Sequence, residues 1–214
     1  MKTLLTILAV SLLASTAFGQ LVITGVIDGP LPGGHPKAVE LCAVMDIADL
    51  GQYGMGSANN GGGTDGIEWV FPAGSSAVMG DFIYVAAADD ANGFATFFGF
   101  EPTFVVDGYA MSINGDDAVE LFLNDVCVDV FGDRDTDGTG EPWEHLDGWA
   151  YRVDNTPDSP DFDVAAWYFS GPNALDNETD NATAATPFPT GTWTFEPGVA
   201  NEAQSLSAVK ALFN

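Results

Sequence analysis

The chain has 214 residues and a formal net charge of −26, with 31 acidic and five basic residues. Hydrophobic residues make up 46% of it and aromatic residues 12%, which is enough for a packed core and argues against disorder. Nucleic acids and anionic membranes repel so negative a chain, so neither is an expected partner. A charged partner should instead be a cation: a metal ion, a basic protein or a mineral surface.

Residues 1–19 have the pattern of a cleaved signal peptide. Lys2 gives a positive start, residues 4–14 are apolar, and Ala17-Phe18-Gly19 places small residues at the cleavage site. A retained membrane anchor is the alternative, but this run is too short to cross a bilayer, and no later stretch approaches about 20 apolar residues. We therefore expect a secreted or cell-surface protein that begins at Gln20 and has no membrane span after signal removal.

Short β-type runs separated by turn residues fill most of residues 20–196, and each is expected to form a strand. These runs are 21–27, 38–45, 68–71, 81–86, 118–123, 126–131, 149–153, 167–169 and 192–195. Residues 51–66 hold seven glycines and are expected to form a long irregular loop, while residues 91–98 suit one or two helical turns. The pattern predicts a single all-β domain, a sandwich or a barrel.

Residues 197–214 lie outside this expected β domain. Within them, residues 201–213 suit a short amphipathic helix, with four apolar side chains on one side: Ala203, Leu206, Val209 and Phe213. The sequence thus predicts a short C-terminal helix after the β domain.

Residues 118–131 are expected to form a hairpin around a two-residue turn, Asn124-Asp125. A regular register pairs residue 121 with 128 and 119 with 130, so that the aliphatic residues share one face. Glu120 and Asp129 would then face each other on the other side, which is unfavourable for like charges. Either that face is solvated or a cation lies between the two carboxylates.

The chain has two cysteines. Alternation along residues 38–42 places Cys42 on the face of Glu40, and Cys127 shares the face of Glu120 and Asp129. Two cysteines in an exported chain predict one disulfide, Cys42–Cys127. The alternative is two separate, half-buried thiols.

Residues 133–144 match the calcium-loop pattern D-x-[DN]-x-[DN]-G-x₅-E at every specified position. Carboxylates at alternate positions of a tight loop can converge on Ca²⁺, with Gly138 permitting the turn. The expected ligands are Asp133, Asp135, Asp137, Glu144 and the carbonyl of Thr139. A preceding strand and Pro142 do not suit an EF-hand, so an acidic turn without metal is the competing interpretation.

Motifs for catalysis are scarce. The chain lacks the G-x-S-x-G, H-E-x-x-H, C-x-x-C and P-loop patterns, and its only histidines are His35 and His145. Glu141, Glu144 and His145 could form a hydrolytic or zinc-binding group, whereas the competing interpretation is a surface histidine in an acidic loop. The sequence therefore assigns no catalytic residue.

Several segments resemble secreted bacterial proteins of the lamin-tail-domain type. They include ITGVIDGPLPGGHPKAVEL (residues 23–41) and, most specifically, DGTGEPWEHLDGWAYR (residues 137–152). The resemblance covers about residues 21–195 and implies an immunoglobulin-like β-sandwich. Domains of this group occur alone or beside extracellular nuclease, phosphatase or adhesion modules, and the resemblance implies no catalytic residues.

Together, these observations predict a secreted non-catalytic module with a surface, matrix or protein–protein interaction role, with calcium as a candidate stabilising ion. Its expected partner is an extracellular or surface protein, matrix or polysaccharide. The alternative is a secreted hydrolase, or the accessory domain of one, acting on a phosphoester or polysaccharide.

Overall fold

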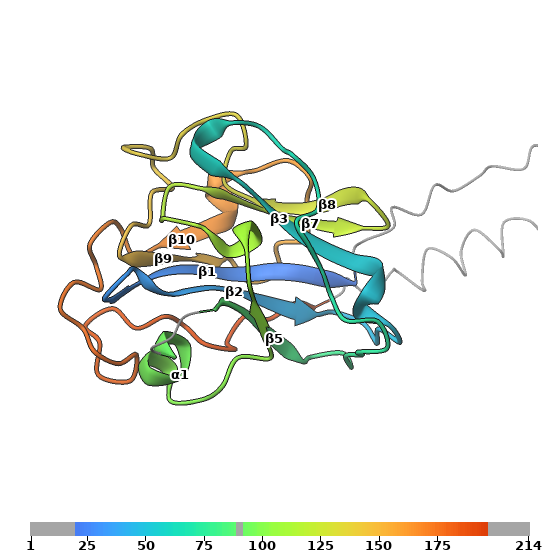
Figure 1. The fold of residues 1–214 in the computed structure, drawn as a ribbon, viewed down its shortest axis with the longest axis horizontal. Coiled ribbons are helices and arrows are strands. Elements are labelled where there is room, and N and C mark those ends of the chain that lie inside the picture. The colour runs from blue at the N-terminus through green and yellow to red at the C-terminus, as the bar shows by residue number, and fades with distance from the viewer. Residues whose placement is uncertain (1–19, 89–91, 197–214) are drawn as a thin grey trace, which may run out of the picture.

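A computed structural model describes residues 20–88 and 92–196, which form two β-sheets packed face to face (Figure 1). The larger sheet has the strand order β10-β9-β1-β2-β5-β6 and the smaller one β4-β3-β7-β8. Neighbouring strands are antiparallel except β5 and β6, which run parallel. The prediction of an all-β sandwich is confirmed.

The strands follow most of the expected runs. Those of the larger sheet are β1 (Leu21–Leu31), β2 (His35–Ala43), β5 (Phe82–Ala87), β6 (Phe104–Val106), β9 (Gly148–Arg152) and β10 (Trp167–Phe169). Those of the smaller sheet are β3 (Tyr53–Ala58), β4 (Trp69–Val70), β7 (Ala118–Leu123) and β8 (Val126–Phe131). The expected helical turns are present as α1 (Gly93–Phe98), but residues 192–195, expected as a strand, are irregular.

The larger sheet is buried on both faces. Its inner face packs against the smaller sheet in a core that includes Val39 and Leu41. Its outer face carries a second apolar cluster, in which α1 and residues 175–193 cover Cys42 and Ile27. The alternation predicted for β2 is therefore confirmed, but the outer face of this strand is buried as well.

The glycine-rich segment 51–66 is only partly a loop. Its first half contains β3, a fully buried strand paired with β4 and β7. A Cβ atom at Gly56 would collide with the carbonyl oxygen of Gly66, because the following loop folds back directly over the strand. The expectation of an irregular loop was wrong here, since these glycines permit close backbone packing inside a sheet rather than a flexible connection.

The β7–β8 hairpin has the expected two-residue turn, and both Asn124 and Asp125 have positive φ. Beyond the first two pairs, the register differs from the predicted one. Phe122 pairs with Cys127, but a bulge then shifts the pairing by one residue. Leu121 therefore pairs with Asp129, and Glu120 pairs with Val130. The predicted Glu120–Asp129 juxtaposition was wrong: the bulge turns Asp129 to the inner face.

The predicted signal peptide (residues 1–19) and C-terminal helix (within residues 197–214) lie outside the described residues. Among the described residues, none of the helices has the length and hydrophobicity of a transmembrane span.

Candidate functional site

The acidic loop, residues 133–144, follows β8 directly and alternates between exposed acids and buried anchors. Asp133, Asp135, Asp137 and Glu141 are exposed, whereas Gly138 and Trp143 are buried. A Cβ at Gly138 would contact the Trp143 ring, so the loop lies tightly on the body of the sandwich. It is an anchored surface element whose carboxylates point to solvent.

The carboxylates of the acidic loop bond to the loop's own backbone. Asp133 accepts hydrogen bonds from the N–H of Asp135 (3.0 Å) and the hydroxyl of Thr136 (2.9 Å). Asp137 accepts from the N–H of Thr139 (2.9 Å), which lowers the pKa of that carboxyl. These local bonds fix the turns of the loop.

The expected calcium ligands do not gather in the structure. Glu144 accepts from the N–H of Gly140 at 2.9 Å, and the Thr139 hydroxyl donates to Asp116 at 2.9 Å. Within residues 20–88 and 92–196, no group of three or more Asp, Glu, His or Cys side chains is placed to hold a metal ion. The structure thus does not bring the expected ligands together around one point, as Ca²⁺ coordination requires.

His145 is fully buried, so the expectation of a surface histidine was wrong. Its ring lies edge-on to Phe131, with centroids 5.1 Å apart, and its Nδ1 is 3.3 Å from the carbonyl oxygen of Trp143. Burial disfavours the charged ring and lowers the pKa of His145 to about 4. The ring is a neutral packing element beneath the acidic loop, and this geometry does not favour the hydrolytic grouping of Glu141, Glu144 and His145.

The expected Cys42–Cys127 disulfide is not formed, and both cysteines are free thiols. Cys42 lies in the outer cluster of the larger sheet, and Cys127 pairs with Phe122 on the smaller sheet. Burial raises the pKa of each thiol to about 11. Both cysteines lie on the outer face of their sheet, as predicted. They belong to different sheets, however, so their side chains point away from each other and cannot form a disulfide.

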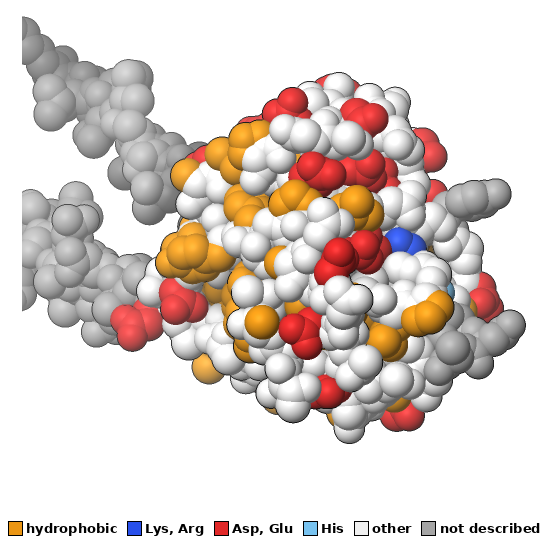
Figure 2. All heavy atoms as spheres, turned by 90° about the vertical axis from the view of Figure 1, so that its left-hand side faces the viewer, with side chains coloured by type: hydrophobic (Ala, Val, Ile, Leu, Met, Phe, Trp, Pro, Cys, Tyr) orange, Lys and Arg blue, Asp and Glu red, His pale blue; other side chains and the backbone are white. Residues whose placement is uncertain are grey.

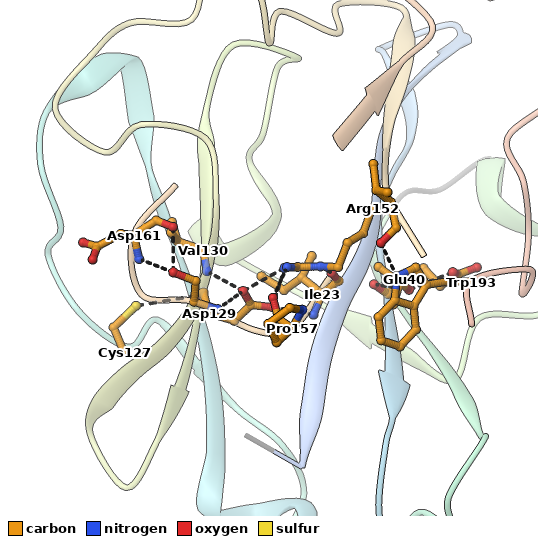
Figure 3. Close-up of polar contacts among 12 residues, drawn as sticks. Ile23, Glu40, Cys127, Asp129, Val130, Arg152, Pro157, Asp161 and Trp193 are labelled. Atoms are coloured by element: carbon orange, nitrogen blue, oxygen red, sulfur yellow. Dashed lines mark hydrogen bonds and ion pairs between the residues drawn. The ribbon is translucent and has the colours of Figure 1, made fainter. Parts of the chain in front are cut away.

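An ion pair between Asp129 and Arg152 joins the two sheets, and the sequence did not predict it. Arg152 Nη2 lies 2.7 Å from both carboxylate oxygens of Asp129, and both side chains are at most 2% exposed. The guanidinium also stacks 4.5 Å above the ring of Trp167. In Figure 3 the two side chains point toward each other from β9 and β8.

This ion pair also satisfies backbone groups that the sheet leaves open. The β1–β9 ladder begins at Gly25, so the backbone of Ile23 has no partner in β9. Asp129 accepts from the backbone N–H of Ile23 at 2.8 Å, and Arg152 Nε donates to the carbonyl oxygen of Ile23. Asp129 further accepts from the N–H of Ser159 at 3.0 Å, so the buried pair is fully hydrogen-bonded.

Glu40 forms a second buried centre on the opposite side of β1 (Figure 3). One carboxylate oxygen accepts from the hydroxyls of Thr24 and Tyr151, both at 2.8 Å, and the other accepts from the N–H of Gly191 at 2.7 Å. The Tyr151 oxygen accepts in turn from the N–H of Trp193 at 3.0 Å. Burial raises the pKa of Glu40, which thus fastens residues 191–193 to the sheet without a cationic partner.

The positive charges of the described chain are all bound to buried carboxylates. Lys37 pairs with Asp28 (2.7 Å), Arg134 with Glu120 (3.2 Å) and Arg152 with Asp129, and these three are the only basic residues described. Figure 2 shows the consequence on one face, where red acidic side chains are spread among orange hydrophobic ones and a single blue patch is visible. The accessible charge is thus almost entirely negative.

Comparison of the chain with protein-family models, with curated proteins and with solved structures found no match.

Proposed function

We propose that the protein is a secreted, non-catalytic binding module that attaches to a basic region of an extracellular or surface protein through the acidic loop. The supporting observation is the geometry of this loop: its exposed carboxylates are held outward on a backbone that they themselves fix. A preorganised acidic surface binds a cationic partner with little loss of conformational entropy.

The charge distribution supports the same proposal. The described cations are used in the interior, so they do not weaken the external negative field. Such a field steers a basic partner toward the surface and weakens as salt screens it. Matrix or polysaccharide carrying cationic groups fits the same chemistry.

The test is binding of the mature chain to a poly-L-lysine surface at low and high salt. The loop variant Asp133→Asn/Asp135→Asn/Asp137→Asn keeps hydrogen-bond acceptors but removes three charges. Its matched control, Glu101→Gln/Asp107→Asn/Asp125→Asn, removes three exposed charges elsewhere. We expect the loop variant to lose at least about 10-fold in affinity for poly-L-lysine and the control only a few-fold. High salt should weaken the binding of all three proteins.

An equal loss in the two variants would show that net charge, not the acidic loop, makes the contact. Absence of binding at low salt would overturn the proposal altogether.

We further infer that the chain is a lamin-tail-type domain of the immunoglobulin-like kind. The inference is based on the sequence segments quoted above, and the two-sheet, mostly antiparallel architecture is compatible with it. Secretion is based on the pattern of residues 1–19.

A further inference from the structure

An apolar groove of about 330 Å³ lies where the second apolar cluster reaches the surface. It is lined by the end of β2, the turn before β5 and the last described residues: Cys42, Ala43, Val44, Met79, Gly80, Phe82, Trp193, Thr194 and Phe195. Met79 is 65% exposed, and the neighbouring Val78 and Met45 are 59% and 54% exposed. Exposed hydrophobic side chains gathered at a groove mark a surface that another apolar surface covers.

The rim of the groove is acidic, and its carboxylates hydrogen-bond to the backbone. Asp81 accepts a hydrogen bond from the N–H of Val78, and Asp46 accepts from the N–H of Met79, each at 2.9 Å. The two carboxylates fix the turn that carries Met79. An occupant should therefore combine an apolar face with a positive charge beside it.

The chain itself supplies such a segment. Phe195 lines the groove and stacks on Trp193, with ring centroids 5.7 Å apart, and 18 residues of sequence follow Glu196. Leu206, Val209 and Phe213 have the spacing of one helical face, and Lys210 lies at its edge. The six residues between Glu196 and Ala203 can span roughly 20 Å, enough for the chain to turn back on the groove.

We propose that residues 201–213 dock into the Met79–Phe195 groove of the same molecule, with Leu206, Val209 and Phe213 facing it and Lys210 near Asp46 and Asp81. A short tether keeps the segment at an effective concentration of about millimolar, which favours this occupant over a second copy of the chain. The docked segment completes the outer cover of the larger sheet. This proposal is independent of the acidic loop.

The experiment measures maleimide labelling of Met79→Cys in the full mature chain carrying Cys42→Ala and Cys127→Ser, because Cys42 is a free thiol that lines the same groove. We expect labelling at least about 10-fold slower than in the same protein with Leu206→Asp/Phe213→Asp, because that change removes the apolar face. The matched control is Gln204→Asp/Ala211→Asp, which adds the same charge at the same spacing on the opposite side of the expected helix. The control should label as slowly as the parent.

A cross-link identifies the occupant. A short bis-maleimide should join Met79→Cys to Val209→Cys within one molecule, and should join Met79→Cys to Ala208→Cys far less. Equally fast labelling in the parent and the Leu206→Asp/Phe213→Asp variant would overturn the proposal. So would protection of Met79→Cys that increases with protein concentration and yields only cross-links between molecules, which would place a second copy in the groove.

Discussion

Two buried carboxylates, Asp129 and Glu40, lie on opposite sides of β1 and are stabilised in different ways. Asp129 faces the space between the sheets and is neutralised by Arg152, a full counter-charge whose Nη2 lies 2.7 Å from both carboxylate oxygens. Glu40 lies under the segment 188–193 and is held only by hydroxyl and amide donors. One centre joins the two sheets, and the other attaches an irregular segment to a single sheet.

The difference shows how a chain with very few cations stabilises a buried acid. A counter-charge stands beside Asp129 between the sheets, because an uncompensated charge in the core is costly. Glu40 has only neutral hydrogen-bond donors, and burial raises the pKa of both carboxyls. The two centres should therefore respond differently to mutation.

The largest effect is expected from Arg152→Met. This change leaves Asp129 buried with no counter-charge, which typically costs about 3–5 kcal/mol of unfolding free energy. Denaturant unfolding followed by tryptophan fluorescence measures it. The double variant Arg152→Met/Asp129→Leu should recover much of the loss, because it removes the isolated charge.

Arg134→Met provides the matched comparison for this prediction. Arg134 pairs with Glu120, but its side chain is 28% exposed, so water can reach the vacated site. We expect a clearly smaller loss than for Arg152→Met. Equal losses of unfolding free energy in the two variants would show that the Asp129–Arg152 pair contributes no more to stability than the Glu120–Arg134 pair.

A moderate effect is expected from Tyr151→Phe at the Glu40 centre. The lost hydroxyl donates to Glu40 and accepts from the N–H groups of Thr192 and Trp193, so about 1–3 kcal/mol of stability should be lost. Hydrogen exchange of the amides of residues 191–193 should become faster. Tyr168→Phe, at the 60% exposed partner of Tyr151 in β10, should change stability by less than about 0.5 kcal/mol.

A smaller, pH-dependent effect is expected from Glu40→Gln. The pKa of Glu40 in the folded chain is raised by burial, so the folded state takes up this proton before the unfolded state does. As the pH falls through the folded-state pKa, wild-type protein should gain stability relative to Glu40→Gln, and the gain should level off below the unfolded value near 4.5. Other carboxyls are present in both proteins and cancel in the difference.

The measurement is denaturant unfolding of both proteins from about pH 8 to pH 4. A difference that is constant across this range would show that Glu40 titrates alike in the folded and unfolded chains.

Sequence patterns predicted the strands better than the contacts between them. Alternation in β2 separated Val39 and Leu41 from Glu40 and Cys42, as the structure confirms. Alternation is a local signal, however, and β8 shows it perfectly in sequence while a bulge inverts the facing of Asp129. The inverted Asp129 contacts Arg152 of the other sheet, and alternation within one strand carries no information about such a contact.

The sites were harder to predict for the same reason. The calcium pattern specifies residue types and spacing, whereas binding requires that the side chains converge, and in the acidic loop backbone N–H groups compete for the same oxygens. The disulfide prediction placed Cys42 and Cys127 on the correct faces of their strands. It could not show that β2 and β8 belong to different sheets. One usable signal was the scarcity of basic residues, since all three described cations proved to be partners of buried acids.

The smallest effect is expected from calcium, which tests the contrast between buried and exposed acids. Because the carboxylates of the acidic loop are not gathered and accept hydrogen bonds from the loop's own backbone, adding millimolar Ca²⁺ in place of chelator should change stability by less than about 0.5 kcal/mol. Thermal unfolding of the mature chain in the two conditions measures this, with Asp135→Ala as the companion variant. A large rise in Tm with Ca²⁺ that disappears in Asp135→Ala would contradict this prediction. It would mean that Ca²⁺ binding is favourable enough to offset the loss of the hydrogen bonds between the loop carboxylates and the loop backbone. A rise that persists in Asp135→Ala would instead reflect screening of the surplus negative charge, and Mg²⁺ should then reproduce it.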